Sequence, residues 1–113
     1  KNPNLLVWHG RPWLIDHGAA LYVQHTWREP RAHARRGFVQ AKDHILLPVA
    51  GSIAEADARL GGRIDRGFLD AVLDAVPDDW LTEPRADYVD YLAARLEAPR
   101  PFVEEVERAR TAA

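Results

Sequence analysis

Residues 2–18 read Asn2-Pro3-Asn4-Leu5-Leu6-Val7-Trp8-His9-Gly10-Arg11-Pro12-Trp13-Leu14-Ile15-Asp16-His17-Gly18. Residues 5–8 and 13–15 are aliphatic and aromatic, a composition typical of β-strands. The four residues between them include the glycine and proline of a tight connection, so the stretch predicts a β-hairpin. Both runs are apolar at consecutive positions, so we expect both faces to be covered, or one face to await a partner.

The two ends of this hairpin carry oxygen ligands. If the link is symmetric, Leu5 faces Asp16, and Asn4 and Asp16 become diagonal neighbours whose Cβ atoms lie about 7 Å apart. Asn2 would lie one pleat further out. Amide and carboxylate oxygens are ligands that Mg²⁺ prefers, together with water and substrate phosphates. Gly18 is expected to permit the backbone turn that follows the acid.

The middle of the chain is basic and then apolar. Residues 28–43 contain a proline and a glycine that act as breakers, and they predict a loop with a short helical turn. Residues 44–48 predict a short, buried apolar plug. Four arginines of the basic segment could hold phosphate or an acidic substrate, or could simply belong to a solvated loop: Arg28, Arg31, Arg35 and Arg36.

The second half of the chain predicts four helices. Ser52 and Glu55 form a capping box at the start of the first, which the glycines at 61–62 end. Asp65 caps the second helix, and prolines delimit the third and fourth. The residues expected to face inward recur at helical spacing: Phe68, Leu69, Val72, Leu73 and Val76, then Tyr88, Tyr91, Leu92 and Leu96, then Phe102, Val103 and Val106.

Composition limits the possible classes. The chain has 113 residues, which allows one domain, and the pattern of elements predicts an α+β fold. Residues 1–54 carry a charge of +4 and residues 55–113 a charge of −6, and the small total argues against nonspecific nucleic-acid binding. No run is apolar enough for a membrane span. Cysteine is absent, which fits the cytoplasm, and the spacing of the five histidines does not suit zinc.

The paired motifs resemble those of the HipA-like kinases, within the protein-kinase-like superfamily. There, a catalytic loop supplies an aspartate base and, five residues later, a metal-binding asparagine, and a hairpin leads on to Asp-Phe-Gly. Residues 2–8 resemble the asparagine end of that loop, and residues 14–18 resemble the aspartate motif, with His17 in place of phenylalanine. The resemblance implies Mg²⁺ and ATP as cofactors, Asp16 and either Asn2 or Asn4 as metal ligands, and His17 and Gly18 beside the nucleotide.

The same resemblance implies that residues 1–113 are the distal part of a kinase-like C-lobe. Residues 1–18 would be the metal-ligand hairpin, residues 19–50 an activation-segment-like region and residues 51–113 a helical subdomain. Because the chain lacks an initiating methionine, we expect a longer parent, with the catalytic base upstream of Lys1. The parent would be a cytoplasmic Ser/Thr protein kinase, and this chain alone would be inactive. The alternative is a non-catalytic helical interaction module or a degenerate kinase remnant.

Overall fold

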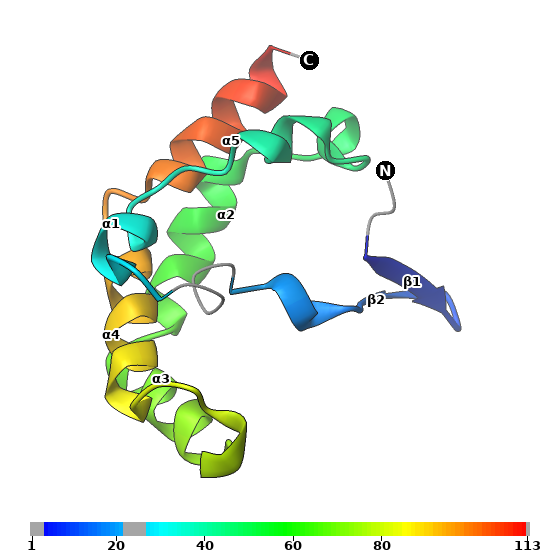
Figure 1. Cartoon of the computed structure of the whole chain (residues 1–113). Helices are drawn as coiled ribbons and strands as arrows, with labels where there is room; N and C mark the ends of the chain where they lie inside the picture. The colour runs from blue at the N-terminus through cyan, green and yellow to red at the C-terminus, as the bar shows by residue number, and fades with distance from the viewer. Residues whose placement is uncertain (1–3, 22–26, 113) are drawn as a thin grey trace.

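The computed structural model describes residues 4–21 and 27–112 of the chain. Within these residues the protein is α+β, as the sequence predicts, with an antiparallel β-hairpin followed by five α-helices (Figure 1). No helix in this part is long and apolar enough to cross a bilayer. The elements are β1 (Leu5–Trp8), β2 (Arg11–Leu14), α1 (Pro30–Ala34), α2 (Ile53–Leu60), α3 (Arg66–Asp74), α4 (Arg85–Leu96) and α5 (Pro101–Thr111), with 3-10 turns η1 (His17–Ala19), η3 (Val39–Asp43), η4 (Leu47–Val49), η5 (Gly61–Arg63) and η6 (Asp78–Trp80).

The hairpin reverses through His9 and Gly10 alone. Both residues have positive φ, 49° and 71°, as a two-residue type I′ connection requires. The next two residues therefore join β2, and Leu5 pairs with Leu14. The predicted four-residue link, with Leu5 opposite Asp16, is wrong by two residues because the chain reverses sooner than the symmetric link assumed.

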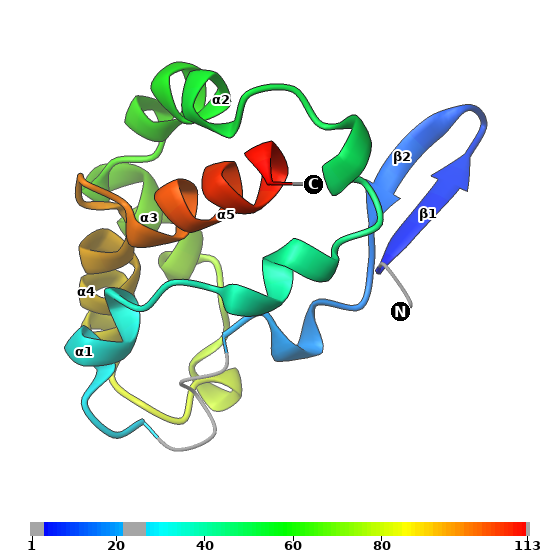
Figure 2. The same ribbon diagram turned by 90° about the horizontal axis from the view of Figure 1, so that it is seen from above.

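Apolar side chains are exposed on both faces of the hairpin. Val7 and Leu14 share one face and are 71% and 72% exposed, while Trp8 and Trp13 on the other face are 60% and 49% exposed. Figures 1 and 2 show the hairpin projecting away from the helical body. The prediction that the chain covers both faces is therefore wrong. The alternative, that one face of the hairpin awaits a partner, remains a prediction. It is favoured because an isolated pair of strands is only marginally stable.

The main core lies between α3 and α4. Leu69 and Leu73 of α3 pack against Tyr88 and Val89 of α4, and Val89 is only 2% exposed. A second small cluster joins α1 to α4 through Ala34 and Tyr91. The helices predicted at these positions are confirmed, and burial of an amphipathic stripe is what stabilises each of them.

Two predicted buried segments are more exposed than their apolar patterns suggest. Phe68 and Val72 of α3 are 51% and 44% exposed, because this helix packs mainly against α4 and buries one narrow stripe. The predicted plug at 44–48 buries Leu47 only, and Ile45 is 62% exposed. A single 3-10 turn follows there, which places one side chain inward and leaves its neighbours outside.

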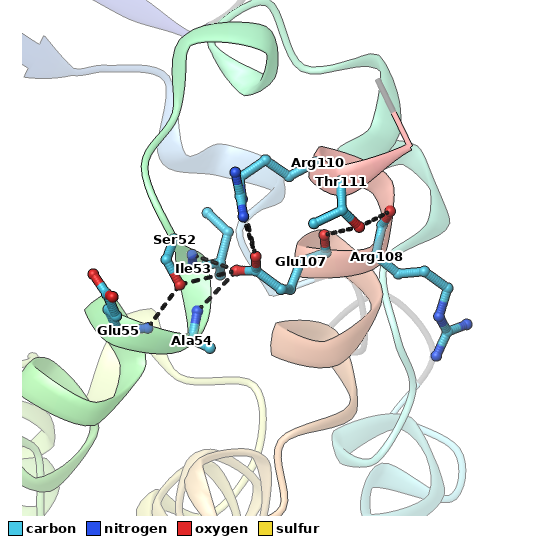
Figure 3. A network of polar contacts seen from close by, with 8 residues as sticks. All are labelled: Ser52, Ile53, Ala54, Glu55, Glu107, Arg108, Arg110 and Thr111. Carbon is cyan, nitrogen blue, oxygen red and sulfur yellow. Dashed lines mark hydrogen bonds and ion pairs between the residues drawn. The ribbon is translucent and has the colours of Figure 1, made fainter.

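A carboxylate from α5 stabilises the start of α2 (Figure 3). Ser52 Oγ accepts a hydrogen bond from the Glu55 N–H at 3.2 Å, which confirms the predicted N-cap. The carboxylate that reaches the other free amides belongs to Glu107 and not to Glu55. Glu107 Oε2 accepts hydrogen bonds from the N–H groups of Ile53 and Ala54 at 2.5 and 3.0 Å. The C-terminal helix is thereby joined to α2.

Candidate functional site

Asn4 and Asp16 lie together at the open end of the hairpin. The Ile15 N–H donates to the Asn4 carbonyl at 3.0 Å, and Asn4 Nδ2 donates to the Asp16 carbonyl at 3.4 Å. In an unbroken strand, Asp16 would point to the face opposite that of Ile15. β2 ends at Leu14, however, and the backbone of Asp16 is left-handed, with φ 57° and ψ 60°, so Asp16 does not follow the alternation of the strand. The two residues are therefore neighbours in a different register, through the Asn4 Nδ2 group and the Asp16 backbone carbonyl, and the joint use of their side-chain oxygens for a metal stays a prediction.

The left-handed conformation of Asp16 also revises the role of Gly18. Among the described glycines, Gly10 is the one with positive φ, so the turn after the acid does not depend on Gly18. Aspartate adopts this conformation more readily than most residues because its short side chain hydrogen-bonds locally. Strained backbone of this kind is concentrated at ligand sites. The predicted backbone role of Gly18 is therefore wrong, and Asp16 itself makes the turn.

A cavity of about 750 Å³ lies between the end of the hairpin and the helices. This volume is in the range of small-molecule binding sites. The hairpin side contributes Asn4, Asp16 and His17, whereas Gly18 is absent from the described lining. The remaining lining residues come from the end of β2 and the residues that follow it, from the segments around α1 and η3, and from α4: Leu14, Ile15, Ala20, His33, Arg36, Gly37, Phe38, Gln40, Tyr91 and Arg95.

The charges that line this cavity are mostly positive. Asp16 is the one carboxylate among its described lining residues, against the guanidinium groups of Arg36 and Arg95. His17 and His33 add two imidazoles that carry positive charge when protonated. The cavity therefore combines oxygen donors suited to a hard cation on the hairpin side with an excess of cationic groups elsewhere.

The four arginines predicted to hold phosphate or an acidic substrate have different surroundings. Arg35 donates to the carbonyls of Ala94, Glu97 and Pro99 at 3.2, 2.6 and 2.5 Å. It thus satisfies carbonyls at the end of α4 that lack helical partners, so its role is structural. Arg31 lines a separate cavity of about 500 Å³, which Arg35 also borders. Arg28 is exposed outside both cavities, which leaves Arg36 as the predicted arginine in the main one.

Arg95 is a charged lining residue that the sequence analysis does not assign to the site. It follows Tyr91 by one helical turn on α4, so the two share a helix face. The helical spacing predicts that Tyr91 lies in the core, and Tyr91 is buried while also lining the cavity. The spacing could have placed Arg95 beside it. Nothing in the sequence indicated that His33 and Gln40 would join them, because that depends on how α1 and η3 pack.

The donor set fits a magnesium ion better than zinc. Asn4 and Asp16 offer amide and carboxylate oxygens, and Mg²⁺ accepts one or two protein ligands when water and phosphates complete its sphere. None of the five ion pairs found among the described residues uses the Asp16 carboxylate. The same part of the chain holds no cluster of three or more His, Asp or Glu side chains able to bind a metal. Asn2, the other predicted ligand, lies outside the described residues.

Comparison with known proteins gives no relative. No protein-family model, curated protein or solved structure matches this chain. The described residues define an α+β protein with a predominantly basic cavity, at which an amide and a carboxylate residue meet. The function of that cavity therefore has to be inferred from the chemistry of its own side chains.

Proposed function

We propose that this chain is the distal C-lobe portion of an ATP- and Mg²⁺-dependent phosphotransferase of the HipA-like type. The observation that carries the proposal is the meeting of Asn4 and Asp16 beside the cavity, at the end of a hairpin. Their oxygens are suited to hold Mg²⁺, which when bound neutralises charge on the β- and γ-phosphate oxygens. His17 lines the same cavity and would lie beside the nucleotide.

The catalytic base belongs to the parent protein in this proposal. Phosphoryl transfer to a serine or threonine hydroxyl needs a group that accepts the hydroxyl proton. The proposal places that aspartate upstream of Lys1, so this chain by itself would bind the metal without transferring phosphate. The parent would act in the cytoplasm, with a protein as its phosphate acceptor.

Metal binding can be tested on this chain with Mn²⁺, which favours the same oxygen ligands as Mg²⁺ and is paramagnetic. Mn²⁺ should broaden the NMR signals of Asn4, Ile15 and His17, and excess Mg²⁺ should restore them. Asp16→Asn should weaken binding by about tenfold or more, since it removes the one carboxylate found among the described lining residues. Asp79→Asn is the matched control, because Asp79 is an exposed acid outside the cavity.

Broadening of NMR signals by Mn²⁺ that is spread evenly over the surface acids would contradict the proposal. Equal effects of Asp16→Asn and Asp79→Asn would have the same meaning. The circular dichroism spectra of both variants should match that of the unsubstituted chain, because neither acid takes part in an ion pair of the described residues. A loss of binding could then not be attributed to unfolding.

Catalysis can be tested only in the complete parent protein. Asp16→Ala there should abolish turnover and leave the fold in place, because it removes a metal ligand without touching the helical core. The proposal also requires an upstream aspartate about five residues before the metal-binding asparagine. An active Asp16→Ala variant, or a parent without that aspartate, would refute the kinase assignment.

The exposed apolar hairpin supports a second candidate, a non-catalytic helical interaction module. Val7 and Leu14, which share one face of the hairpin, are 71% and 72% exposed, and contiguous apolar surface of this kind marks interaction sites. In this alternative, residues 5–15 dock on a partner and the kinase motifs are remnants. Calorimetry of the parent with Mg²⁺-ATP separates the two, because a remnant should give no binding heat.

A further inference from the structure

The cavity has a basic side that the proposed metal site does not use. Its residues are His33 in α1, Arg36 just after α1 and Arg95 in α4, and we call these three the basic side. Figure 2 shows α1 and α4 together on the opposite side of the molecule from the β-hairpin. The proposed metal ligands and the basic side therefore belong to different structural elements that line the same cavity.

Arg95 is held in place by the segment that carries Arg36. Its Nη1 donates to the carbonyls of Ala34 and Arg36 at 3.1 and 2.9 Å. Its guanidinium carbon also lies 4.7 Å from the ring centre of Phe102, a cation–π contact. Because these contacts fix the side chain before any ligand arrives, little conformational entropy remains to be lost on binding.

No ion pair of the described residues neutralises Arg36 or Arg95, although the Glu105 carboxylate lies close by and accepts a hydrogen bond from the Phe38 N–H, two residues after Arg36. The ion pairs found there involve Arg66, Arg85, Arg100 and Arg110, and none involves Arg36 or Arg95. Asp16 is the one carboxylate in the described lining. Two permanent positive charges in a partly enclosed cavity attract an anion, because the low-dielectric walls focus the field.

We infer that the basic side is a binding site for a phosphate group in its dianionic form. Guanidinium groups suit this ligand because their planar donors match phosphate oxygens, often two at a time. The cavity volume of about 750 Å³ leaves room for more than the phosphate itself. Two sources share this chemistry: a phosphorylated side chain of a protein, and the phosphates of a nucleotide.

This inference goes beyond the proposed function because it requires neither a metal ion nor a catalytic base. It therefore makes a prediction about the chain on its own, in the presence of a chelator. Asp16→Asn should leave phosphate binding intact or strengthen it, since the substitution removes a negative charge from the lining. Failure of the metal site and failure of the phosphate site are thus separate results.

The test is a titration of the metal-free chain at low ionic strength, where electrostatic binding is least screened. The probes are inorganic phosphate, a phosphoserine peptide and ATP, each followed by calorimetry and by amide NMR shifts. Arg36→Gln should weaken binding by about tenfold or more, as expected for loss of a charged hydrogen bond. Arg108→Gln is the control, because it removes the same charge from an exposed position outside the cavity.

The expected amide shifts are centred on residues 33–38. Binding of the phosphoserine peptide through Arg36 assigns the site to a phosphorylated protein, and binding of ATP alone assigns it to a nucleotide. Equal weakening by Arg36→Gln and Arg108→Gln would overturn the inference, because it would show nonspecific attraction. Absence of shifts in the cavity would also overturn it. Arg36 is exposed, so its substitution should not unfold the chain.

Discussion

At the scale of single residues, Glu107 connects two helices through one carboxylate. The hydrogen bond from Arg110, followed by those from the Ala54 and Ile53 amides, lowers its pKa to about 2 from an ordinary value of 4.5. The folded state therefore prefers the ionised carboxylate more strongly than the unfolded chain does. The resulting stabilisation is complete above about pH 4.5 and is lost as the pH falls from there through about 2.

Replacing Glu107 with glutamine tests this dependence. Glu107→Gln should lower the free energy of unfolding at neutral pH, because the neutral amide cannot replace the charge-assisted hydrogen bonds. The difference from the unsubstituted chain should shrink as the pH falls from about 4.5 towards 2. Urea unfolding across this range measures it. Glu104→Gln, an exposed change on the same helix, should show no such convergence, and a pH-independent Glu107→Gln defect would contradict the account.

At the scale of elements, the hairpin depends on the backbone of its two-residue turn. Gly10 has φ 71°, a conformation that costs other L-residues about 1–2 kcal/mol. Gly10→Ala should therefore reduce the population of the hairpin, with loss of the NMR contact between Leu6 and Trp13, which are paired across the strands. The helical core should keep its stability, since Gly10 has no atom near its side-chain position.

Gly18→Ala is the matched control for the turn. Gly18 also has open space around it, and positive φ among the described glycines is found at Gly10. The Leu6–Trp13 contact should be unchanged in this variant. An equal loss in both variants would mean that the turn conformation does not control the register of the hairpin.

At the scale of the whole molecule, the chain is less compact than its length allows. Its radius of gyration is 15.4 Å, against about 13 Å expected for a compact domain of this length. The projecting hairpin and the small number of buried side chains among the described residues agree with this value. Apolar burial is the main favourable term in folding, so the isolated chain should be marginally stable.

A core truncation measures how much that small core contributes. Leu73→Ala, at a position 7% exposed, should lower the free energy of unfolding by about 2–5 kcal/mol. Such a loss could unfold much of the isolated chain. Val72→Ala on the same helix is the control, since Val72 is 44% exposed and should change stability far less. Thermal unfolding followed by circular dichroism gives both values, and equal losses would contradict the assigned core.

The sequence by itself determined the order of strands and helices and the starts of α2 and α3. Ser52 and Asp65 cap helices as predicted, because capping depends on side chains within three residues of the amides that they accept from. The closeness of Asn4 and Asp16 also followed from a short hairpin. The register did not, because it depended on whether two or four residues make the turn.

Only the tertiary structure decided which distant residues share the cavity and which arginines are structural. Arg35 is bound to carbonyls at the end of α4, about sixty residues away, while Arg36 beside it lines the cavity. Glu107 stabilises a helix start more than fifty residues earlier in the chain. The sequence does not distinguish Arg35 from Arg36, because they are adjacent residues of the same type. The packing of the helices gives each of them different surroundings. Contacts of this range arise from that packing and leave no local pattern in the sequence.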